Sequence, residues 1–214
     1  MADTSGQEHV KGNKVNLIRT DSAGKVVAIA SSTGGPKALQ KLIPLLPKEL
    51  NAPVLLVQHM PAGFTEALAS RLNDLSRVTV KEAEEGDILQ KGCVYLARGG
   101  RHMNVVRCLR GHMIHYSDEP PREGVRPCAN YMYESLADSA YDLIVCAVLT
   151  GMGADGTAGI AALKQKKKVL VYAQDEDSCT VYGMPKCIIK SGLALVGIPL
   201  ERIAQEIIKN VGVC

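Results

Sequence analysis

Residues 26–36 read VVAIASSTGGP, an apolar run that ends in two serines, a threonine and two glycines. A short run of small and β-branched residues without polar alternation is typical of a strand buried on both faces. Gly34, Gly35 and Pro36 suit a tight turn into a helix, because glycine permits close backbone approach and proline fits the first helical turn. The stretch therefore predicts a buried parallel strand that passes directly into a helix.

The same order of strand and helix recurs along the chain. Further apolar runs predict strands at 54–57, 143–149 and 169–173. Apolar residues at three- and four-residue spacing predict helices at 37–46, 65–75, 131–140, 158–166 and 199–211. Strands that alternate with helices indicate an α/β doubly wound fold with a mainly parallel sheet.

The middle of the chain departs from this alternation. Strand-like segments at 93–97, 102–108 and 113–116 are separated only by short glycine-containing links. Strands joined by such short links pair as antiparallel neighbours. We therefore expect a β-hairpin insert within a single α/β domain.

Length and composition fit one globular domain. The chain has 214 residues, 46% of them hydrophobic and 22% charged, which is enough for a core without disulfide or metal staples. Residues 1–24 are polar and aperiodic, so we expect a disordered tail or linker remnant there and the folded domain at 25–214. Seven cysteines without a Cys-x-x-Cys spacing indicate reduced thiols.

Net charge and the absence of certain motifs exclude several classes of partner. A net charge of +3 is too balanced for nucleic acid to be the main partner. The sequence has neither a signal peptide nor an apolar stretch of membrane-spanning length, so a cytoplasmic protein without membrane insertion is expected. His102, His112 and His115 have no ligand-spaced cysteine or carboxylate set beside them, so no metal site is expected. With Arg98, Arg101 and Arg107 they are expected to form a basic surface.

Reactive side chains follow three of the predicted strands. In open α/β sheets, the loops at the carboxyl ends of strands form the crevice where ligands bind. Ser32 follows the first strand, next to helix N–H groups that can stabilise an oxyanion. The alternative is that Ser32 or Thr33 only caps the helix.

His59 and Asp155 follow two other strands, in QHMPAGF (58–64) and TGMGADG (150–156). Asp155 could equally cap the next helix. Together, however, Ser32, His59 and Asp155 supply a nucleophile, a base and a carboxylate that fixes the tautomer of the base. The order Ser, His, Asp and the lack of a Gly-x-Ser-x-Gly motif disfavour the α/β-hydrolase fold, although triads are defined by geometry and not by sequence order.

The motifs resemble those of the chemotaxis-receptor methylesterase (CheB) family. The resemblance lies in SSTGG (31–35), QHMP (58–61) with Gly63-Phe64, and LTGMGADG (149–156), and it extends to Glu82-Ala83-Glu84 and Gly183-Met184-Pro185. It covers the chain from about Lys25 to the C-terminus.

The resemblance implies an α/β esterase that hydrolyses glutamate γ-methyl esters on the cytoplasmic helices of methyl-accepting chemoreceptors, releases methanol and also deamidates particular glutamines. It implies no cofactor. Carried over by position, Ser32 is the nucleophile, His59 the general base and acid, and Asp155 the carboxylate that orients His59. By the same resemblance, the Met152 backbone is an oxyanion donor and Thr33 positions the nucleophile or the imidazole.

Two departures from the family pattern stand out. Family members usually carry an N-terminal receiver domain, whereas about 24 polar residues precede the first predicted strand here. We therefore expect a catalytic domain without a receiver domain, either isolated or belonging to a family member that is regulated in another way. The family also tends to read Arg-Pro-Ser-x-Asp where this chain has Arg-Pro-Cys-Ala-Asn at 126–130. We expect the second departure to alter substrate engagement near that loop.

Two other functions remain open from the residues. Gly151, Gly153 and Gly156 form a G-x-G-x-x-G pattern between a strand and a helix, with Asp175 and Glu176 about 20 residues later, as in dinucleotide-binding proteins. This pattern normally opens the first βαβ unit, whereas here it lies late in the chain. The other alternative is a non-catalytic module that binds receptors.

Overall fold

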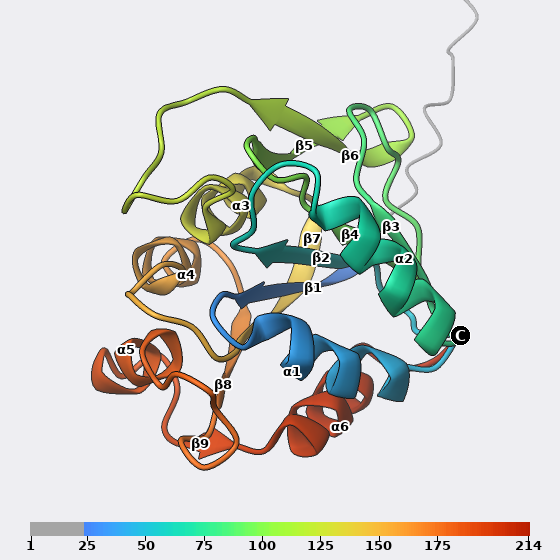
Figure 1. Ribbon diagram of the computed structural model, residues 1–214. Coiled ribbons are helices and arrows are strands. Elements are labelled where there is room, and N and C mark those ends of the chain that lie inside the picture. The colour runs from blue at the N-terminus through green and yellow to red at the C-terminus, as the bar shows by residue number, and fades with distance from the viewer. Residues whose placement is uncertain (1–23) are drawn as a thin grey trace, which may run out of the picture.

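The computed structural model describes residues 24–214 (Figure 1). The tail predicted at 1–24 lies outside the described residues, apart from Gly24, which opens the first strand. Seven strands form one sheet in the order β3-β4-β2-β1-β7-β8-β9, and every neighbouring pair is parallel. The strands are β1 Gly24–Ser31, β2 Val54–Gln58, β3 Thr79–Glu82, β4 Cys93–Leu96, β7 Tyr141–Val148, β8 Val169–Gln174 and β9 Gly197–Ile198. The doubly wound α/β fold is confirmed.

Helices cover both faces of the sheet (Figure 1). They are α1 Gly35–Leu42, α2 Thr65–Leu75, α3 Ala129–Ser135, α4 Thr157–Lys164, α5 Met184–Lys190 and α6 Leu200–Val211, with 3₁₀ turns at Ile43–Leu45 and Leu136–Asp138. Strand β1 faces two cores: Val26, Ala28 and Ala30 pack with α3, α4 and α5, whereas Val27 and Ile29 pack with α1, α2 and α6. Burial on both faces explains its uninterrupted apolar run.

The position of β1 decides where a ligand can bind. From β1 the chain moves to β2 on one side, and it later returns to β7 on the other side. Such a reversal opens a crevice beyond the carboxyl ends of the strands. The loops after β1, β2 and β7 are those that carry Ser32, His59 and Asp155.

The predicted hairpin is present as β5 (His102–Cys108) and β6 (Gly111–Ser117), which pair antiparallel. The expectation that 93–97 belongs with it is wrong. Residues Cys93–Leu96 form β4, which lies between β2 and β3 in the parallel sheet. Val94, Tyr95 and Leu96 are buried, so this strand needs the cover of the main sheet.

The expected basic surface of histidines is also corrected. His102 is fully buried, and its Nδ1 accepts a hydrogen bond from the Cys128 N–H. His112 is buried and stacks on Tyr141. Only His115 of the three is exposed. Imidazole rings pack readily when neighbouring backbone groups satisfy their nitrogens, and this accounts for their burial.

Three short elements, β3, α5 and β9, were not predicted. Each has seven residues or fewer, and the sequence pattern of such short segments is weak. Among residues 24–214, none of the helices combines the length and the apolar character needed to traverse a bilayer.

Candidate active site

Backbone hydrogen bonds hold three strand ends together. The His59 N–H donates to Ser31 O at 3.0 Å, which joins the end of β2 to the end of β1. The Ser32 N–H donates to Thr150 O at 3.0 Å, which joins the end of β1 to the loop after β7. The segments that carry the three predicted triad residues therefore meet at one edge of the sheet.

The two adjacent serines have different surroundings. Ser31 is buried and its hydroxyl donates to Gln58 Oε1 at 2.7 Å. Gln58 in turn donates through Nε2 to Ser32 O at 2.9 Å and to His59 O at 3.1 Å. Ser31 is thus part of a brace behind the site, whereas Ser32 is partly exposed on its rim.

Helix α1 begins without a side-chain cap. Its N-cap residue is Gly34, in the left-handed region at φ 81°, and no side-chain oxygen bonds to the helix start there. The alternative that Ser32 or Thr33 serves as the cap is therefore not realised. The Thr33 side chain is exposed, and its carbonyl accepts a hydrogen bond from Thr150 Oγ1 at 2.9 Å.

Gly151 allows the loop after β7 to approach Ser32. A Cβ atom at position 151 would lie 2.7 Å from Ser32 Cβ and 2.3 Å from Met184 Sδ. The next residue, Met152, is 74% exposed. Within the described residues its N–H donates to no other atom, so this backbone donor is available beside the nucleophile candidate.

His59 and Asp155 are joined by a short hydrogen bond. His59 Nε2 lies 2.7 Å from Asp155 Oδ2, and the two side chains are 9% and 3% exposed. Since a carboxylate only accepts, Nε2 carries the proton, and Nδ1 of the neutral ring is left as an acceptor. This is the tautomer that a general base for a neighbouring hydroxyl requires.

Asp155 does not cap the helix that follows it. Instead, Oδ2 accepts from the Ala129 N–H at 2.6 Å and Oδ1 from the Asn130 N–H at 2.9 Å, both at the start of α3. Oδ1 also accepts from the Cys128 thiol at 3.0 Å. Burial opposes ionisation of Asp155, but the hydrogen bonds from His59, Cys128 and Ala129 outweigh it and keep the pKa of this carboxyl below its usual value.

Helix α4 receives its cap from α3. Asn130 Oδ1 accepts from the Gly156 N–H at 3.1 Å and from the Gly159 N–H at 2.7 Å. These are the amides to which a pyrophosphate would bind in a dinucleotide site. Since Asn130 occupies them, the geometry does not support the dinucleotide alternative suggested by the glycine pattern.

The contact of residues 128–130 with Asp155 was not predicted from the sequence. The expected effect of the departure at 126–130 on substrate engagement stays a prediction. Cys128, Ala129 and Asn130 are all buried and contact Asp155. The available signal was the pair Cys128 and Asn130, which lies just before the helix predicted at 131–140. Their common partner, Asp155, lies 25 to 27 residues away in sequence.

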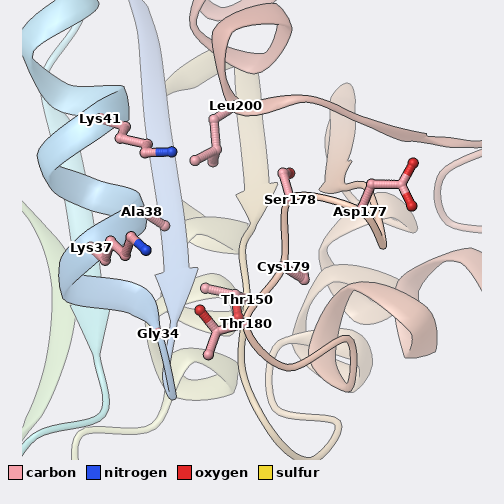
Figure 2. A pocket seen from close by; sticks show the side chains of 10 residues that line it. All are labelled: Gly34, Lys37, Ala38, Lys41, Thr150, Asp177, Ser178, Cys179, Thr180 and Leu200. Carbon is pink, nitrogen blue, oxygen red and sulfur yellow. The ribbon is translucent and has the colours of Figure 1, made fainter.

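A cavity of about 240 Å³ lies between α1 and the loop that follows β8. Figure 2 shows Lys37 and Lys41 extending from α1 toward residues 177–180 across it. Gly34 and Thr150 also line the cavity. None of Ser32, His59 and Asp155 lines it, so the candidate triad lies outside this cavity, at the open ends of the strands. Among residues 24–214, no cluster of three His, Cys, Asp or Glu side chains is placed to hold a metal ion.

Comparison with known sequences identifies relatives over most of the chain. The sequence model of the CheB methylesterase family matches residues 27–207. A protein-glutamate methylesterase/protein-glutamine glutaminase of Vibrio vulnificus (strain YJ016) is 46% identical over 188 residues, which cover 88% of this chain and 50% of that protein. The protein of that name from Bacillus subtilis (strain 168) is 46% identical over 183 residues, covering 86% and 51%. The chain spans about half the length of the curated relatives it matches.

The fold has a solved counterpart. The crystal structure of the Thermotoga maritima CheB methylesterase catalytic domain matches with a TM-score of 0.85 and 39% sequence identity, over 89% of this chain and 100% of that one. Sequence and fold therefore agree, and the chain belongs to the CheB methylesterase family.

Proposed function

We propose that this chain is a serine-type esterase that hydrolyses glutamate γ-methyl esters on the cytoplasmic domains of methyl-accepting chemoreceptors. The observation that carries the proposal is the 2.7 Å hydrogen bond between His59 and Asp155, at the same sheet edge as Ser32. Family membership supports the substrate class. The proposal places the protein in the cytoplasm, with no cofactor.

In the proposed mechanism, Ser32 Oγ attacks the ester carbonyl carbon while His59 Nδ1 accepts the hydroxyl proton. Asp155 holds the imidazole by its Nε2–H and stabilises the charge that develops on it. The Met152 N–H donates to the oxyanion, and Thr33 helps to position the nucleophile or the imidazole.

Attack by Ser32 gives a tetrahedral intermediate. Its collapse releases methanol, whose oxygen takes the proton from His59. Water, deprotonated by His59, then attacks the acyl-enzyme and regenerates Ser32 with a glutamate carboxylate as the product. The same steps with an amide in place of the ester would release ammonia from glutamine. Deamidation is therefore part of the proposal.

The arginines near the hairpin form a second part of the proposal, a surface that contacts acidic receptor helices. Arg98 and Arg101 are 50% and 39% exposed, and they pair with Glu82 at 2.9 Å and Asp118 at 3.0 Å. The carboxylates offset part of their charge, so we expect a modest contribution. Charge reversal at Arg98 should raise KM for a receptor substrate, and an unaltered KM would contradict this surface.

The primary experiment is methanol release from a carboxyl-methylated receptor cytoplasmic fragment. Ser32→Ala should reduce turnover by about 10⁶-fold, as loss of a nucleophile does in serine hydrolases. The matched control is Ser31→Ala, which removes the neighbouring hydroxyl from the brace and should retain most of the activity. Equal rates for the wild type and Ser32→Ala would refute the mechanism, and no release from either folded protein would favour a non-catalytic receptor-binding module.

A further inference from the structure

Cys128 contacts Asp155, the candidate carboxylate that orients His59. It is fully buried, and its Sγ lies 3.0 Å from Asp155 Oδ1. Burial, together with the negative charge of Asp155, raises the pKa of the Cys128 thiol to about 12. The group is therefore a protonated thiol that donates its S–H to the carboxylate.

Each carboxylate oxygen of Asp155 accepts hydrogen bonds from two donors. Oδ2 accepts from His59 and from the Ala129 N–H, whereas Oδ1 accepts from the Asn130 N–H and the Cys128 thiol. The bonds on Oδ1 fix the rotation of the carboxylate and so keep Oδ2 directed at the imidazole. Of the donors on Oδ1, only the thiol belongs to a side chain that a substitution can remove.

We propose that Cys128 is a positioning residue for the esterase reaction, acting through Asp155. The inference rests on the proposed function, because it assigns Asp155 the task of orienting His59. A thiol is a weaker donor than a hydroxyl, so Cys128 withdraws less charge from the carboxylate than a serine at this position would. Donor strength at position 128 therefore adjusts how strongly Asp155 stabilises protonated His59.

A second buried thiol provides the matched control. Cys146 in β7 is also fully buried, and among the described residues its sulfur forms no hydrogen bond. Burial alone raises the pKa of its thiol. Substitution at Cys146 changes packing without touching Asp155, whereas substitution at Cys128 changes both.

The experiment measures kcat and KM against pH for Cys128→Ala, Cys128→Ser and Cys146→Ser, with the methylated receptor fragment as substrate. Cys128→Ala should lower kcat roughly tenfold with little change in KM, since it removes a charge-assisted hydrogen bond remote from substrate. The carboxylate then carries more charge and favours protonated His59, so the acid limb should move to higher pH by roughly half a unit. Cys128→Ser should have a kcat close to that of the wild type, and its acid limb should lie at lower pH than in the wild type. Cys146→Ser should have the same pH profile as the wild type.

A second readout does not depend on activity. The proton on His59 Nε2, held by Asp155, should give a downfield ¹H NMR resonance that shifts in both Cys128 variants and stays in place in Cys146→Ser. An unshifted resonance in folded Cys128→Ala, or a pH profile equal to that of the wild type, would overturn the role of Cys128. Loss of activity in Ser32→Ala together with an unshifted resonance would preserve the proposed function and reject this inference alone. Shifted resonances with no esterase activity in the wild type would reject the proposed function and retain the contact with Asp155.

Discussion

The two halves of the candidate catalytic centre are held in place by different forces. Ser32 and His59 rest on the sheet, where backbone hydrogen bonds join the ends of β1, β2 and β7, and Gly151 leaves room for close approach. Asp155 is held by helices. Its carboxylate accepts hydrogen bonds from N–H groups at the start of α3, and Asn130 in α3 accepts hydrogen bonds from N–H groups at the start of α4. The first half should therefore be sensitive to added volume, and the second to the loss of a donor or an acceptor.

Among variants that keep the Ser32 hydroxyl, the largest effect is expected on the helical half. Asp155→Asn replaces an acceptor-only group with an amide, whose NH₂ would face a backbone N–H or the His59 proton. We expect kcat to fall about 10⁴-fold, since the imidazole loses the partner that fixes its tautomer. Steady-state kinetics with the methylated receptor fragment measures this effect, and the exposed Asp142→Asn is the control. A fall of less than tenfold would mean that Asp155 does not act on His59.

The sheet half is tested by adding one methyl group. Gly151→Ala places a Cβ 2.7 Å from Ser32 Cβ, so Ser32 or the loop beside Met152 must move. Displacement of the nucleophile relative to an oxyanion donor should lower kcat/KM roughly 10²- to 10³-fold.

Gly153→Ala is the comparison variant for this test. It strains the same loop at φ 93°, but its Cβ meets nothing within 4 Å. It should therefore cost stability while retaining more activity than Gly151→Ala. Equal kcat/KM losses for the two variants would show that the loop conformation matters and the contact with Ser32 does not.

The same contrast explains what the sequence could predict. The strands β1, β2 and β7 were predicted because their burial on both faces leaves continuous apolar runs, and Ser32, His59 and Asp155 were proposed as candidates from the motifs that follow them. Their proximity to one another follows from parallel topology alone.

What could not be predicted depends on packing between distant segments. The contact of Cys128 with Asp155 spans 27 positions, and no local pattern encodes it. The burial of His102 likewise depends on the hairpin packing against the start of α3. The placement of β4 inside the parallel sheet was missed because its short connection to β5 resembled that of a hairpin.

Removal of the α4 cap should act mainly on stability. Asn130→Ala leaves the N–H groups of Gly156 and Gly159 buried without an acceptor. We expect the free energy of unfolding to fall by about 1 to 2 kcal/mol, as for loss of other helix caps. Thermal unfolding followed by circular dichroism measures this change.

Asn130→Asp is the matched variant, because it keeps an oxygen for both N–H groups. It loses the hydrogen bond from Nδ2 to Glu123 and places the new carboxylate at position 130 near that of Glu123. We expect its stability to lie between those of the wild type and Asn130→Ala. An alanine variant as stable as the wild type would show that these caps do not hold the helical half together.

The smallest effect concerns pH and the donors at the start of α3. Burial lowers the pKa of His102, whose neutral Nδ1 accepts the Cys128 N–H. The folded state therefore binds fewer protons at this site than the unfolded chain. The stability it contributes is fully present above the unfolded pKa of about 6.5 and is lost as pH falls through the folded value.

His102→Gln keeps an acceptor that does not titrate, so it should lose less stability than the wild type between pH 7.5 and pH 5. Urea unfolding at the two pH values measures the difference. The stability of His102→Gln should still fall somewhat with pH, because burial also lowers the pKa of His112. The lowered pKa of Asp155 affects stability only at more acidic pH. An equal loss in both proteins would show that His102 protonation does not disturb the segment that supports Asp155.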